Sequence, residues 1–484
     1  MNQTTSSSPD ENVHARQVFS LNVLKGLALF GLLLTSIWSL GGFINNERTF
    51  YKIGTHGGNY NLLSVVSGLF EWKMSALLAI AFGAGILIFF RKKDHPVSLP
   101  ATDAYIRSQF WLMFLGLLNA FLLLWSGDIL FQFSVVGILI FVFSKMSSRG
   151  LFIAAVFCTL IYSGKLYWNF ADDKKSYGKY LKVTAVETKF KQDSLARAKK
   201  DSLNKPTDSL ALKDWNIKKK LDDSLAKKRD TLTKIQQQDK GGWEGLLKGL
   251  KFDSATTKAE NKNMRTGYAK VWNHVKSRAQ QNESITLYRT GIWEISSMMF
   301  LGMALLSIGF FSSRFSASRY FIIAAICLIL GAGLSWFRIH FEVVRLIDYL
   351  VYIKGRSLPY NFFLPFEIGL MALGYASLLM WFIRMNVLQF LWKALAKAGK
   401  MALTNYIMQS IICTFFFYGY GFSYFGRLSQ WELYFVVAEI MLVQIVFSVF
   451  WLRNYESGPL EWLWRCLVYR KWLPNRKQES TNLS

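Results

Sequence analysis

Residues 399–410 read Gly-Lys-Met-Ala-Leu-Thr-Asn-Tyr-Ile-Met-Gln-Ser, and they open an apolar segment long enough to cross a lipid bilayer. Side chains such as Thr404, Asn405 and Gln409 are costly in hydrocarbon unless each finds a hydrogen-bond partner. A second motif at 458–465, Gly-Pro-Leu-Glu-Trp-Leu-Trp-Arg, follows the last apolar segment. The two motifs predict a membrane-embedded module with polar side chains at its edge or inside it.

The composition extends this prediction to the whole chain. Of its 484 residues, 52% are hydrophobic and 16% aromatic, which is too apolar for an ordinary soluble domain of this size. The apolar residues gather in blocks close to the ~20 residues that cross a ~30 Å hydrocarbon core. These blocks lie at about 20–42, 69–90, 108–126, 128–145, 150–169, 291–312, 319–337, 361–383, 402–424 and 431–452. Because the runs are continuous rather than alternating, they exclude a closed barrel and predict an all-α, polytopic membrane bundle of about ten transmembrane helices.

The distribution of Lys and Arg predicts the orientation. The tail 1–18 is polar, and the first apolar block is too long for a cleavable signal and lacks a small-residue cleavage site. If this tail is cytoplasmic, most Lys and Arg of the short loops fall on the cytoplasmic side, as the positive-inside rule requires. We therefore expect a multi-pass protein of a bacterial-type cytoplasmic (inner) membrane, with both termini in the cytoplasm and the lipid bilayer as its partner.

The net charge of +26 does not indicate a nucleic-acid partner. Residues 171–290 carry 28 Lys and Arg against 15 Asp and Glu, half of the whole excess, and the rest fits the cytoplasmic loops. Anionic lipid head groups are the natural counter-charge. The four cysteines form no CxxC and no metal spacing, so we expect packing residues and predict no metal site.

Residues 171–290 form a hydrophilic insertion that is expected to be extracytoplasmic. Asp-Ser-Leu recurs in it at steps of 8, 7 and 15 residues, which puts the leucines on one helix face, and Pro206 is expected to interrupt that helix. The insertion can be a solvated, helical or partly disordered arm, or a docking arm for an envelope polymer or an anionic surface. The expected domains are 1–18 (tail), 19–170 (five helices), 171–290 (insertion), 291–457 (five helices) and 458–484 (interfacial and cytoplasmic tail).

The C-terminal tail carries an interfacial pattern. Three tryptophans alternate with three cations, namely Trp462, Trp464 and Trp472 with Arg465, Arg470 and Lys471. Such a segment is expected to lie in the inner membrane interface and anchor the chain there.

Two candidate sites lie in the N-terminal half. Glu71 and Lys73 open the second apolar block, where they can be an exposed helix-start pair or line a polar pocket in a catalytic or substrate-anchoring role. Asp128 lies in the very short turn between the third and fourth blocks, where it can cap a helix or act as a general base at the mouth of the bundle. Asn119, about two turns earlier, is expected to face the bundle interior.

A third candidate ends the seventh apolar block. Arg338, His340 and Glu342 can form a group for proton transfer, or a solvated helix end with ordinary ion pairs. Farther on, Asn405 and Gln409 are candidates for a hydrogen-bonding lining. No GxSxG, HExxH, P-loop or Rossmann signature is present.

Several motifs resemble the YeiB-like family, which is described by a C-terminal domain of unknown function, number 418. They are Leu24-Lys25-Gly26, Phe70-Glu71-Trp72-Lys73, Phe82-Gly83-Ala84-Gly85, Gly127-Asp128-Ile129-Leu130, Leu301-Gly302-Met303-Ala304, Leu373-Gly374-Tyr375, Gly399 to Tyr406, Phe417 to Gly421, Phe425 to Ser429 and Gly458 to Arg465. The resemblance covers nearly the whole chain apart from the N-terminal tail and the insertion.

The resemblance implies, at a distance, similarity to membrane acyltransferases. The implied reaction moves an acyl group from a cytoplasmic thioester, acyl-CoA as the donor, to a hydroxyl or amine acceptor at the outer face, and it needs a base and oxyanion donors. The chain departs from the family pattern with Asn22 and Lys25 in the first block. It has Asn119 where many members have His, so that base is missing here, whereas Glu71, Lys73 and Asp128 are retained.

The leading hypothesis is thus an acyltransferase-like or substrate-handling role. Asp128 and Glu71, with His340 as a further candidate, would handle protons. Lys73 would stabilise charge, and Asn119, Arg338, Asn405 and Gln409 would contact substrate. The alternatives are a transporter of a small solute or lipid precursor, and a non-catalytic envelope protein that works through its charged arm.

Overall fold

Continuous apolar runs become helices because a helix satisfies its backbone hydrogen bonds within one segment. The computed structural model describes residues 9–42, 57–91, 100–250 and 254–477. Within these ranges the regular elements are all helical, and the one extended pairing is a bridge between Tyr455 and Arg476. The prediction of an all-α protein is confirmed. The outermost parts of both predicted tails, 1–8 and 478–484, lie outside the described residues.

The chain divides into two compact units, one formed by 1–166, 252–343 and 360–484 and the other by 167–251 and 344–359. The last part of the expected insertion therefore belongs to the first unit. Met264, Val271 and Val275 are buried there in the same apolar cluster as Tyr418 and Phe425. In this division the first unit resumes at residue 252, about 40 residues before the expected end of the insertion at residue 290.

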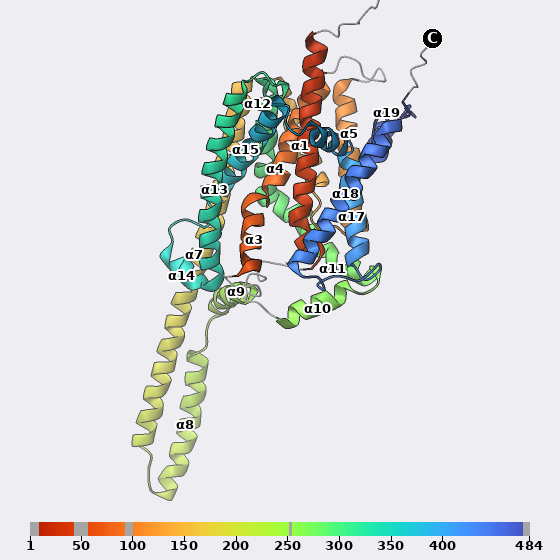
Figure 1. The fold of residues 1–484 in the computed structure, drawn as a ribbon. Coiled ribbons are helices and arrows are strands. Elements are labelled where there is room, and N and C mark those ends of the chain that lie inside the picture. Colours follow the sequence, from red (N-terminus) through yellow and green to blue (C-terminus); the bar gives the residue numbers. More distant parts are fainter. Residues whose placement is uncertain (1–8, 43–56, 92–99, 251–253, 478–484) are drawn as a thin grey trace, which may run out of the picture. The chain divides into compact units, whose positions relative to one another are not determined.

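The first unit is a bundle of helices (Figure 1). In chain order its elements are α1 (Pro9–Leu40), α3 (Gly58–Leu69), α4 (Lys73–Arg91), α5 (Ala101–Leu117), η1 (Leu118–Leu122), α6 (Leu130–Ile140), η2 (Phe141–Lys145), the start of α7 (Ser148–Leu203), α10 (Ser254–Met264), α11 (Tyr268–Gln280), η3 (Gln281–Gly291), α12 (Ile292–Ser307), η4 (Phe310–Ser312), most of α13 (Ala317–Ile347), α15 (Leu364–Arg384), α16 (Gln389–Lys400), α17 (Ala402–Phe417), α18 (Gln430–Asn454) and α19 (Pro459–Tyr469). The beginning of α1 and the end of α19 lie at the same end of this unit (Figure 1).

Seven helical segments of the described chain are long and apolar enough to cross a membrane, judged by length and composition. They are Val13–Leu40, Gly58–Arg91, Ser148–Leu203, Tyr268–Ser307, Ala317–Arg345, Leu364–Arg384 and Gln430–Asn454. Two shorter apolar helices, Leu130–Lys145 and Ala402–Phe417, accompany them. Several apolar helices therefore indicate a membrane protein, while the count of ten spans remains a prediction.

Two helix crossings explain several glycines of the sequence motifs. A Cβ on Gly399 would overlap the carbonyl oxygen of Asn22, so α16 and α1 touch backbone to backbone at this point. A Cβ on Gly302 would overlap the carbonyl oxygen of Ile80 in the same way, where α12 crosses α4. Only glycine permits such an approach, which is the usual role of small residues between helices in membranes.

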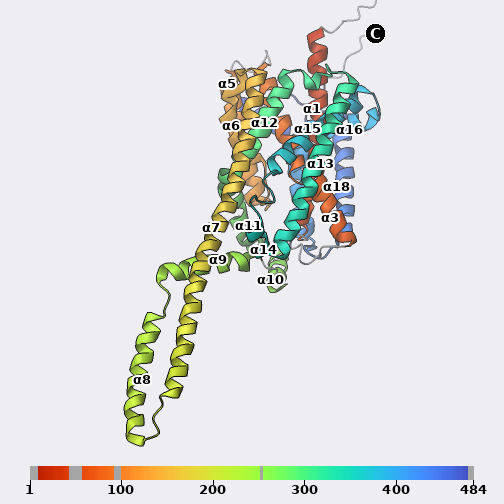
Figure 2. The same ribbon diagram turned by 90° about the vertical axis from the view of Figure 1, so that its left-hand side faces the viewer.

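The second unit holds the rest of α7 with α8 (Ser209–Arg229), α9 (Lys234–Leu250) and α14 (Tyr349–Gly355). Within it, α7 and α8 run side by side (Figures 1 and 2), and ion pairs such as Lys219–Asp201 at 3.8 Å join them. The helix break predicted at Pro206 is confirmed, since α7 ends at Leu203 and α8 begins at Ser209. The repeated leucines of α7 and α8 are exposed.

Candidate functional site

A break between α3 and α4 interrupts one of the long apolar segments. The helix α3 ends at Leu69 and α4 begins at Lys73, with a turn at 70–72 between them. Trp72 in this turn has φ +60°, a left-handed conformation that costs an ordinary residue roughly 1–2 kcal/mol. The break leaves the C-terminal carbonyls of α3 without partners inside the helix.

Side chains from three different helices satisfy these carbonyls. Lys73 Nζ donates to the Ser67 carbonyl at 3.1 Å. Ser335 Oγ of α13 donates to the Gly68 carbonyl at 2.8 Å, and Tyr375 Oη of α15 donates to the Leu69 carbonyl at 2.7 Å. A cation also suits the negative end of a helix dipole. The break is therefore a built joint that ties α3 and α4 to α13 and α15.

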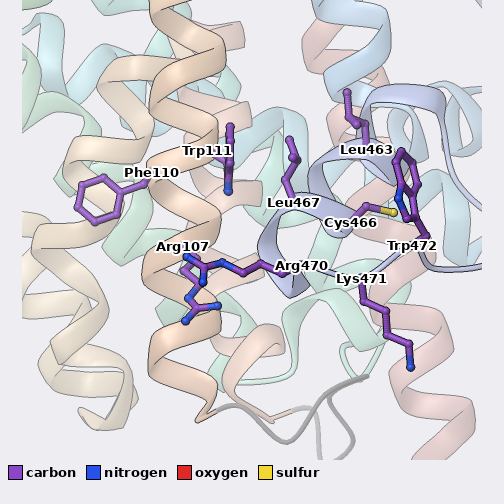
Figure 3. A pocket seen from close by; sticks show the side chains of 9 residues that line it. All are labelled: Arg107, Phe110, Trp111, Leu463, Cys466, Leu467, Arg470, Lys471 and Trp472. Atoms are coloured by element: carbon purple, nitrogen blue, oxygen red, sulfur yellow. The ribbon is translucent and has the colours of Figure 1, made fainter.

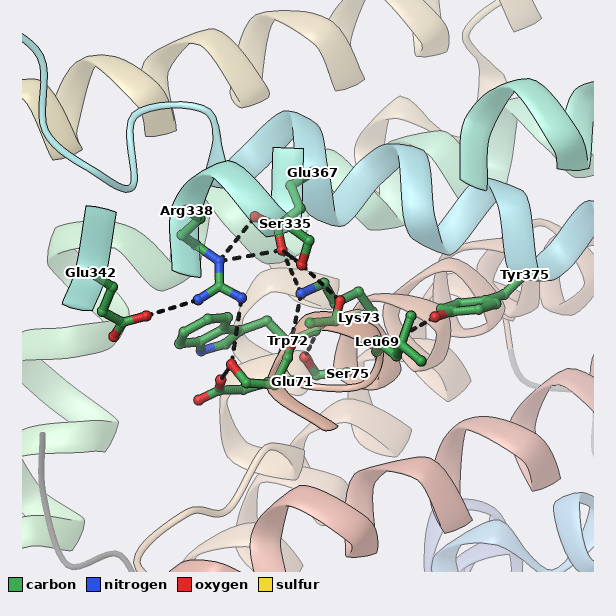
Figure 4. Close-up of polar contacts among 12 residues, drawn as sticks. Leu69, Glu71, Trp72, Lys73, Ser75, Ser335, Arg338, Glu342, Glu367 and Tyr375 are labelled. Atoms are coloured by element: carbon green, nitrogen blue, oxygen red, sulfur yellow. Dashed lines mark hydrogen bonds and ion pairs between the residues drawn. The ribbon is translucent and has the colours of Figure 1, made fainter. Parts of the chain in front are cut away.

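Buried charges surround this joint (Figure 4). Glu367 of α15 lies 2.5 Å from Lys73 Nζ and 3.0 Å from Arg338 Nε, and Arg338 also pairs with Glu342 at 3.2 Å. Lys73, Glu367 and Arg338 are almost completely inaccessible to solvent. Removing one member of such a group leaves an uncompensated buried charge, which costs about 3–5 kcal/mol.

Glu71 adds a third carboxylate on the far side of the joint. Glu71 accepts a hydrogen bond from the Ser67 hydroxyl. Beside it, the Arg338 guanidinium lies 5.0 Å from the centre of the Trp72 ring. With two cations and three carboxylates, the group carries one negative charge in excess when all are ionised. Unlike Lys73 and Arg338, Glu71 lines a cavity.

This acidic cavity has a volume of about 340 Å³. Three carboxylates line it: Glu71 from the helix break, Asp128 from the turn before α6, and Glu294 from α12. Among the described residues, no group of three or more metal-binding side chains is placed to hold a metal ion. The cavity suits neutral or cationic polar groups and disfavours anions.

Asp128 lies at the base of this cavity and is fully buried. It accepts hydrogen bonds from Asn119 Nδ2 at 2.8 Å, from the backbone N–H of Phe131 at 2.9 Å and from Tyr406 Oη at 3.3 Å. Asp128 thus caps the first turn of α6 and also lines a cavity, while its role as a general base stays a prediction. Asn119 points inward as predicted.

A second cavity has a volume of about 330 Å³ and is mainly apolar. Lys25, Lys400 and Glu461 are among its lining residues, and so is Tyr406. Burial lowers the pKa of Lys400, and Lys477 lowers it further, whereas burial raises the pKa of Glu461. Ile129 and Phe133 line both cavities, so they form the wall between them.

The motif at residues 399–410 joins neighbouring helices to one another. Glu461 of α19 accepts from the backbone N–H of Leu403 at 2.7 Å and from the Thr404 hydroxyl at 2.5 Å, which caps the start of α17. Asn405 donates to Ser448 of α18 at 3.0 Å. Gln409 donates to Gln444 of α18 at 2.9 Å. These amides bond to protein groups and line neither cavity.

The structure thus brings together some of the predicted site residues and separates others. Asp128 and Glu71 both line the acidic cavity, and Asn119 is hydrogen-bonded to Asp128. Lys73 and Arg338 both pair with Glu367 at the joint. His340 is exposed and stacks on Trp336 with ring centres 5.6 Å apart, away from these groups. The four cysteines are buried and free, in agreement with packing residues.

Sequence reasoning missed Glu367, Glu294 and Gln444. Each is a polar residue within a long apolar helix, at 364–384, 292–307 and 430–454 respectively. Isolated polar residues of this kind are rare and generally have a partner inside the bundle, which is the signal that was available. The partner itself depends on which helices are neighbours.

The described residues define a class: a helical protein in which seven helical segments are long and apolar enough to cross a membrane, with a buried charged joint in one broken helix. Residues 305–471 match the family model described as protein of unknown function (DUF418). The C-terminal part of the chain is thus similar to the DUF418 family, in agreement with the resemblance to YeiB-like proteins. No solved structure matches the chain.

Three relatives are similar to the chain. Uncharacterized protein YeiB of Escherichia coli (strain K12) is 34% identical over 246 residues, which cover 46% of this chain and 59% of that protein. Uncharacterized protein YxaH of Bacillus subtilis (strain 168) is 21% identical over 472 residues, 95% of this chain and 96% of that protein. An uncharacterized 39.9 kDa protein of Bacillus acidopullulyticus, encoded in the amylase 3' region, is 33% identical over 100 residues, 21% of this chain and 28% of that protein.

Proposed function

We propose that the protein is an acyltransferase of a bacterial-type inner membrane, with ten membrane spans and both termini in the cytoplasm. It moves an acyl group from a cytoplasmic thioester donor, acyl-CoA, to a hydroxyl or amine acceptor from the outer side. The ten spans are the seven long apolar segments, the two shorter ones, and α5 with η1. An even number agrees with both ends of the first unit lying on one side (Figure 1).

One observation carries the proposal: an apolar cavity and a carboxylate-lined cavity share the wall of Ile129 and Phe133. Next to this wall, Tyr406 of the apolar cavity is hydrogen-bonded to Asp128 of the acidic cavity. A reaction that joins an apolar acyl chain to a polar acceptor needs this pair of environments in contact. Lys25 and Lys400 give the apolar cavity the cations that suit a phosphate-bearing thioester.

The proposed step uses Asp128 as the base. The acceptor oxygen or nitrogen attacks the thioester carbonyl carbon as its proton passes to the Asp128 carboxylate. A C–O or C–N bond forms, the C–S bond breaks, and the proton from Asp128 ends on the leaving thiolate. As Asp128 takes up the acceptor proton, the Tyr406 hydroxyl shifts its hydrogen bond from Asp128 to the developing oxyanion, and Asn119 holds the carboxylate in place.

Glu71 and the joint have a supporting role. Glu71 and Glu294 line the acceptor cavity, where they accept hydrogen bonds from hydroxyl or ammonium groups. Lys73, Glu367 and Arg338 fix the helix break that aims Glu71 into the cavity. The excess of carboxylates favours an amino sugar or a neutral polyol as the acceptor over a phosphorylated one.

The test is acyl transfer by the purified full chain in lipid nanodiscs. Radiolabelled acyl-CoA is supplied with an amino sugar, a neutral polyol or a sugar phosphate, and labelled product is separated from donor. We expect product with one of the first two, and a loss of about 10²–10⁴-fold in Asp128→Asn. The matched control is Glu432→Gln, because this carboxylate caps α18 at an exposed position remote from both cavities. Absence of product with all three acceptors, or full activity in Asp128→Asn, would contradict the proposal.

The helix break favours one second candidate, a transporter. Interrupted helices with charged groups at the break form the substrate sites of many membrane transporters. In that case vesicles containing the protein would accumulate a labelled solute without any chemical change to it, and Asp128→Asn would reduce uptake. Acylated product and unmodified accumulated solute are separate readouts, so one experiment on the same vesicles distinguishes the two functions.

A further inference from the structure

A third pocket, of about 380 Å³, lies between α5 and α19 (Figure 3). Arg107 of α5 lines one side, and Arg470 and Lys471, directly after α19, line the other. The side chains of Arg107 and Arg470 extend toward one another (Figure 3). None of the residues that line this pocket also lines one of the two cavities of the proposed reaction. The helices α5 and α19 nevertheless contribute other residues to the apolar cavity.

Among the described residues, the three cations of this pocket have no acidic counterpart. In the part of the chain that the structure describes, no carboxylate forms an ion pair with Arg107, Arg470 or Lys471, while eleven ion pairs are formed elsewhere. Cations gathered in one pocket repel each other unless an anion lies between them. The guanidinium group of arginine fits a phosphate with two parallel hydrogen bonds.

The remaining walls are apolar and aromatic. Phe110, with 54% of its surface exposed, and Trp472, with 74% exposed, flank the cations, and Trp111 and Leu467 complete the pocket. On the same side of α5, Phe114 is 48% exposed. A ligand that satisfies both kinds of wall carries an anionic group and long apolar chains.

The pocket is held open by hydrogen bonds on both sides. Trp464 Nε1 of α19 donates to the Ser108 carbonyl of α5 at 2.9 Å, which fixes the distance between the two walls. Trp462 Nε1 donates to the Leu473 carbonyl at 2.7 Å, which holds the segment after α19 against the helix. Arg470 adopts a left-handed conformation, φ +51°, that ends α19 and directs the chain across the pocket.

We propose that this pocket binds one anionic diacyl phospholipid of the inner leaflet. Arg107, Arg470 and Lys471 hold the phosphate, and the acyl chains lie along Phe110 and Phe114. The pocket lies toward the end of the first unit that holds the start of α1 and the end of α19 (Figure 1), the end predicted to face the cytoplasm. The inference is independent of acyl transfer, because it uses none of the residues assigned to that reaction.

The experiment is native mass spectrometry of the full chain in a neutral detergent. It is titrated separately with phosphatidylglycerol, with phosphatidylcholine of the same acyl chains, and with inorganic phosphate. We expect one phosphatidylglycerol to bind first, at least tenfold tighter than phosphatidylcholine. In Arg107→Gln/Arg470→Gln/Lys471→Gln this first binding weakens on the order of 100-fold, since each cation near a membrane surface contributes about fivefold.

A matched variant controls for overall charge. Arg314→Gln/Arg319→Gln/Lys393→Gln removes three exposed cations that line none of the three cavities, and it is expected to change the first binding less than threefold. Arg470→Gln alone, at an exposed position, is expected to weaken it about fivefold and serves if the triple variant fails to fold. Equal losses in the two triple variants, or equal affinity for both lipids, would overturn the inference. Equal binding of inorganic phosphate would mean that the pocket takes a free anion and not a lipid.

Discussion

Tyr406 and Asp128 lie 278 residues apart in the chain, yet the Tyr406 hydroxyl is 3.3 Å from Oδ1 of Asp128. Tyr406 belongs to the motif 399–410 of the C-terminal half, and Asp128 belongs to Gly127-Asp128-Ile129-Leu130 of the N-terminal half. The Tyr406 hydroxyl also accepts a hydrogen bond from the backbone N–H of Ile129 at 3.1 Å. Two motifs from opposite halves thus meet at the wall between the two cavities.

Replacing Tyr406 by Phe removes only this hydroxyl. If it stabilises the oxyanion, acyl transfer by Tyr406→Phe falls about 10²–10³-fold at unchanged donor affinity. The matched control is Tyr424→Phe, because Tyr424 is exposed and stacks on Phe416 with ring centres 4.8 Å apart. A Tyr406→Phe enzyme that keeps full turnover would show that the hydroxyl only supports the fold.

Glu367 is predicted to be the most sensitive charge in the first unit. Glu367→Gln leaves Lys73 without its carboxylate and should lower the free energy of unfolding by about 3–5 kcal/mol, measured by unfolding in detergent mixtures. The added change Lys73→Met removes the orphaned ammonium and should restore part of the loss. Asp239→Asn, which breaks an exposed pair with Lys179, should cost at most about 1 kcal/mol. Equal losses for the two carboxylates would refute a buried joint.

Because α1 and α16 touch at Gly399, one methyl group added at this position is predicted to lower the stability of the protein. Gly399→Ala should destabilise the protein by about 1–3 kcal/mol, because its Cβ would meet the backbone of α1 and not a movable side chain. Gly333→Ala in α13 meets nothing within 4 Å, so it should be neutral or stabilise by about 0.5–1 kcal/mol. Melting temperatures in detergent measure the difference, and a harmless Gly399→Ala would speak against the backbone contact.

Glu461 makes stability depend on pH. Burial raises its pKa above the ordinary value near 4.5, so the folded protein holds this proton more tightly than the unfolded chain does. This contribution to stability is full below the ordinary pKa and is lost as pH rises through the raised one. As the pH is raised above the ordinary pKa of a glutamate, melting temperatures of the wild type should therefore fall more than those of Glu461→Gln. Parallel curves for the two proteins would exclude this role.

None of the described residues of the second unit lines either cavity of the proposed reaction. Replacing residues 191–230, which hold the end of α7 and all of α8, by a short Gly-Ser linker should leave acyl transfer within twofold. The same deletion tested in cells reports on docking: an intact envelope phenotype would argue against a docking arm. A tenfold loss of transfer in nanodiscs would instead assign the arm a part in the reaction.

The sequence predicted those features that depend on local pattern. Continuous apolar runs become helices in the structure, Pro206 separates α7 from α8, and Asn119 faces inward. Asp128 was recognised as a candidate because it lies in the short turn between two apolar blocks, where it can cap a helix or act as a base. Its partner Tyr406 was not, since no spacing rule relates residues on helices whose adjacency is unknown.

The contacts of other candidate residues likewise depend on which helices are neighbours, which the sequence does not reveal. Asn405 and Gln409 were expected to line a substrate site, but Ser448 and Gln444 on α18 supply partners for them, and that pairing depends on the register of two helices. Arg338 was grouped with His340 by proximity in sequence. The helix surface turns His340 outward to Trp336 and Arg338 inward to Glu367.

The ion pair of Lys73 with Glu367 has a consequence for how the protein is made. Ribosomes add roughly 5–20 residues per second, so Lys73 emerges roughly 15–60 seconds before its counter-charge does. During that interval the second apolar segment reaches the membrane with a lysine that hydrocarbon disfavours by about 2.5–3.5 kcal/mol at its centre. If the segment 58–91 spans a bilayer as proposed, its lysine lacks this counter-charge until α15 has been made, and chains that stop short of α15 never acquire it.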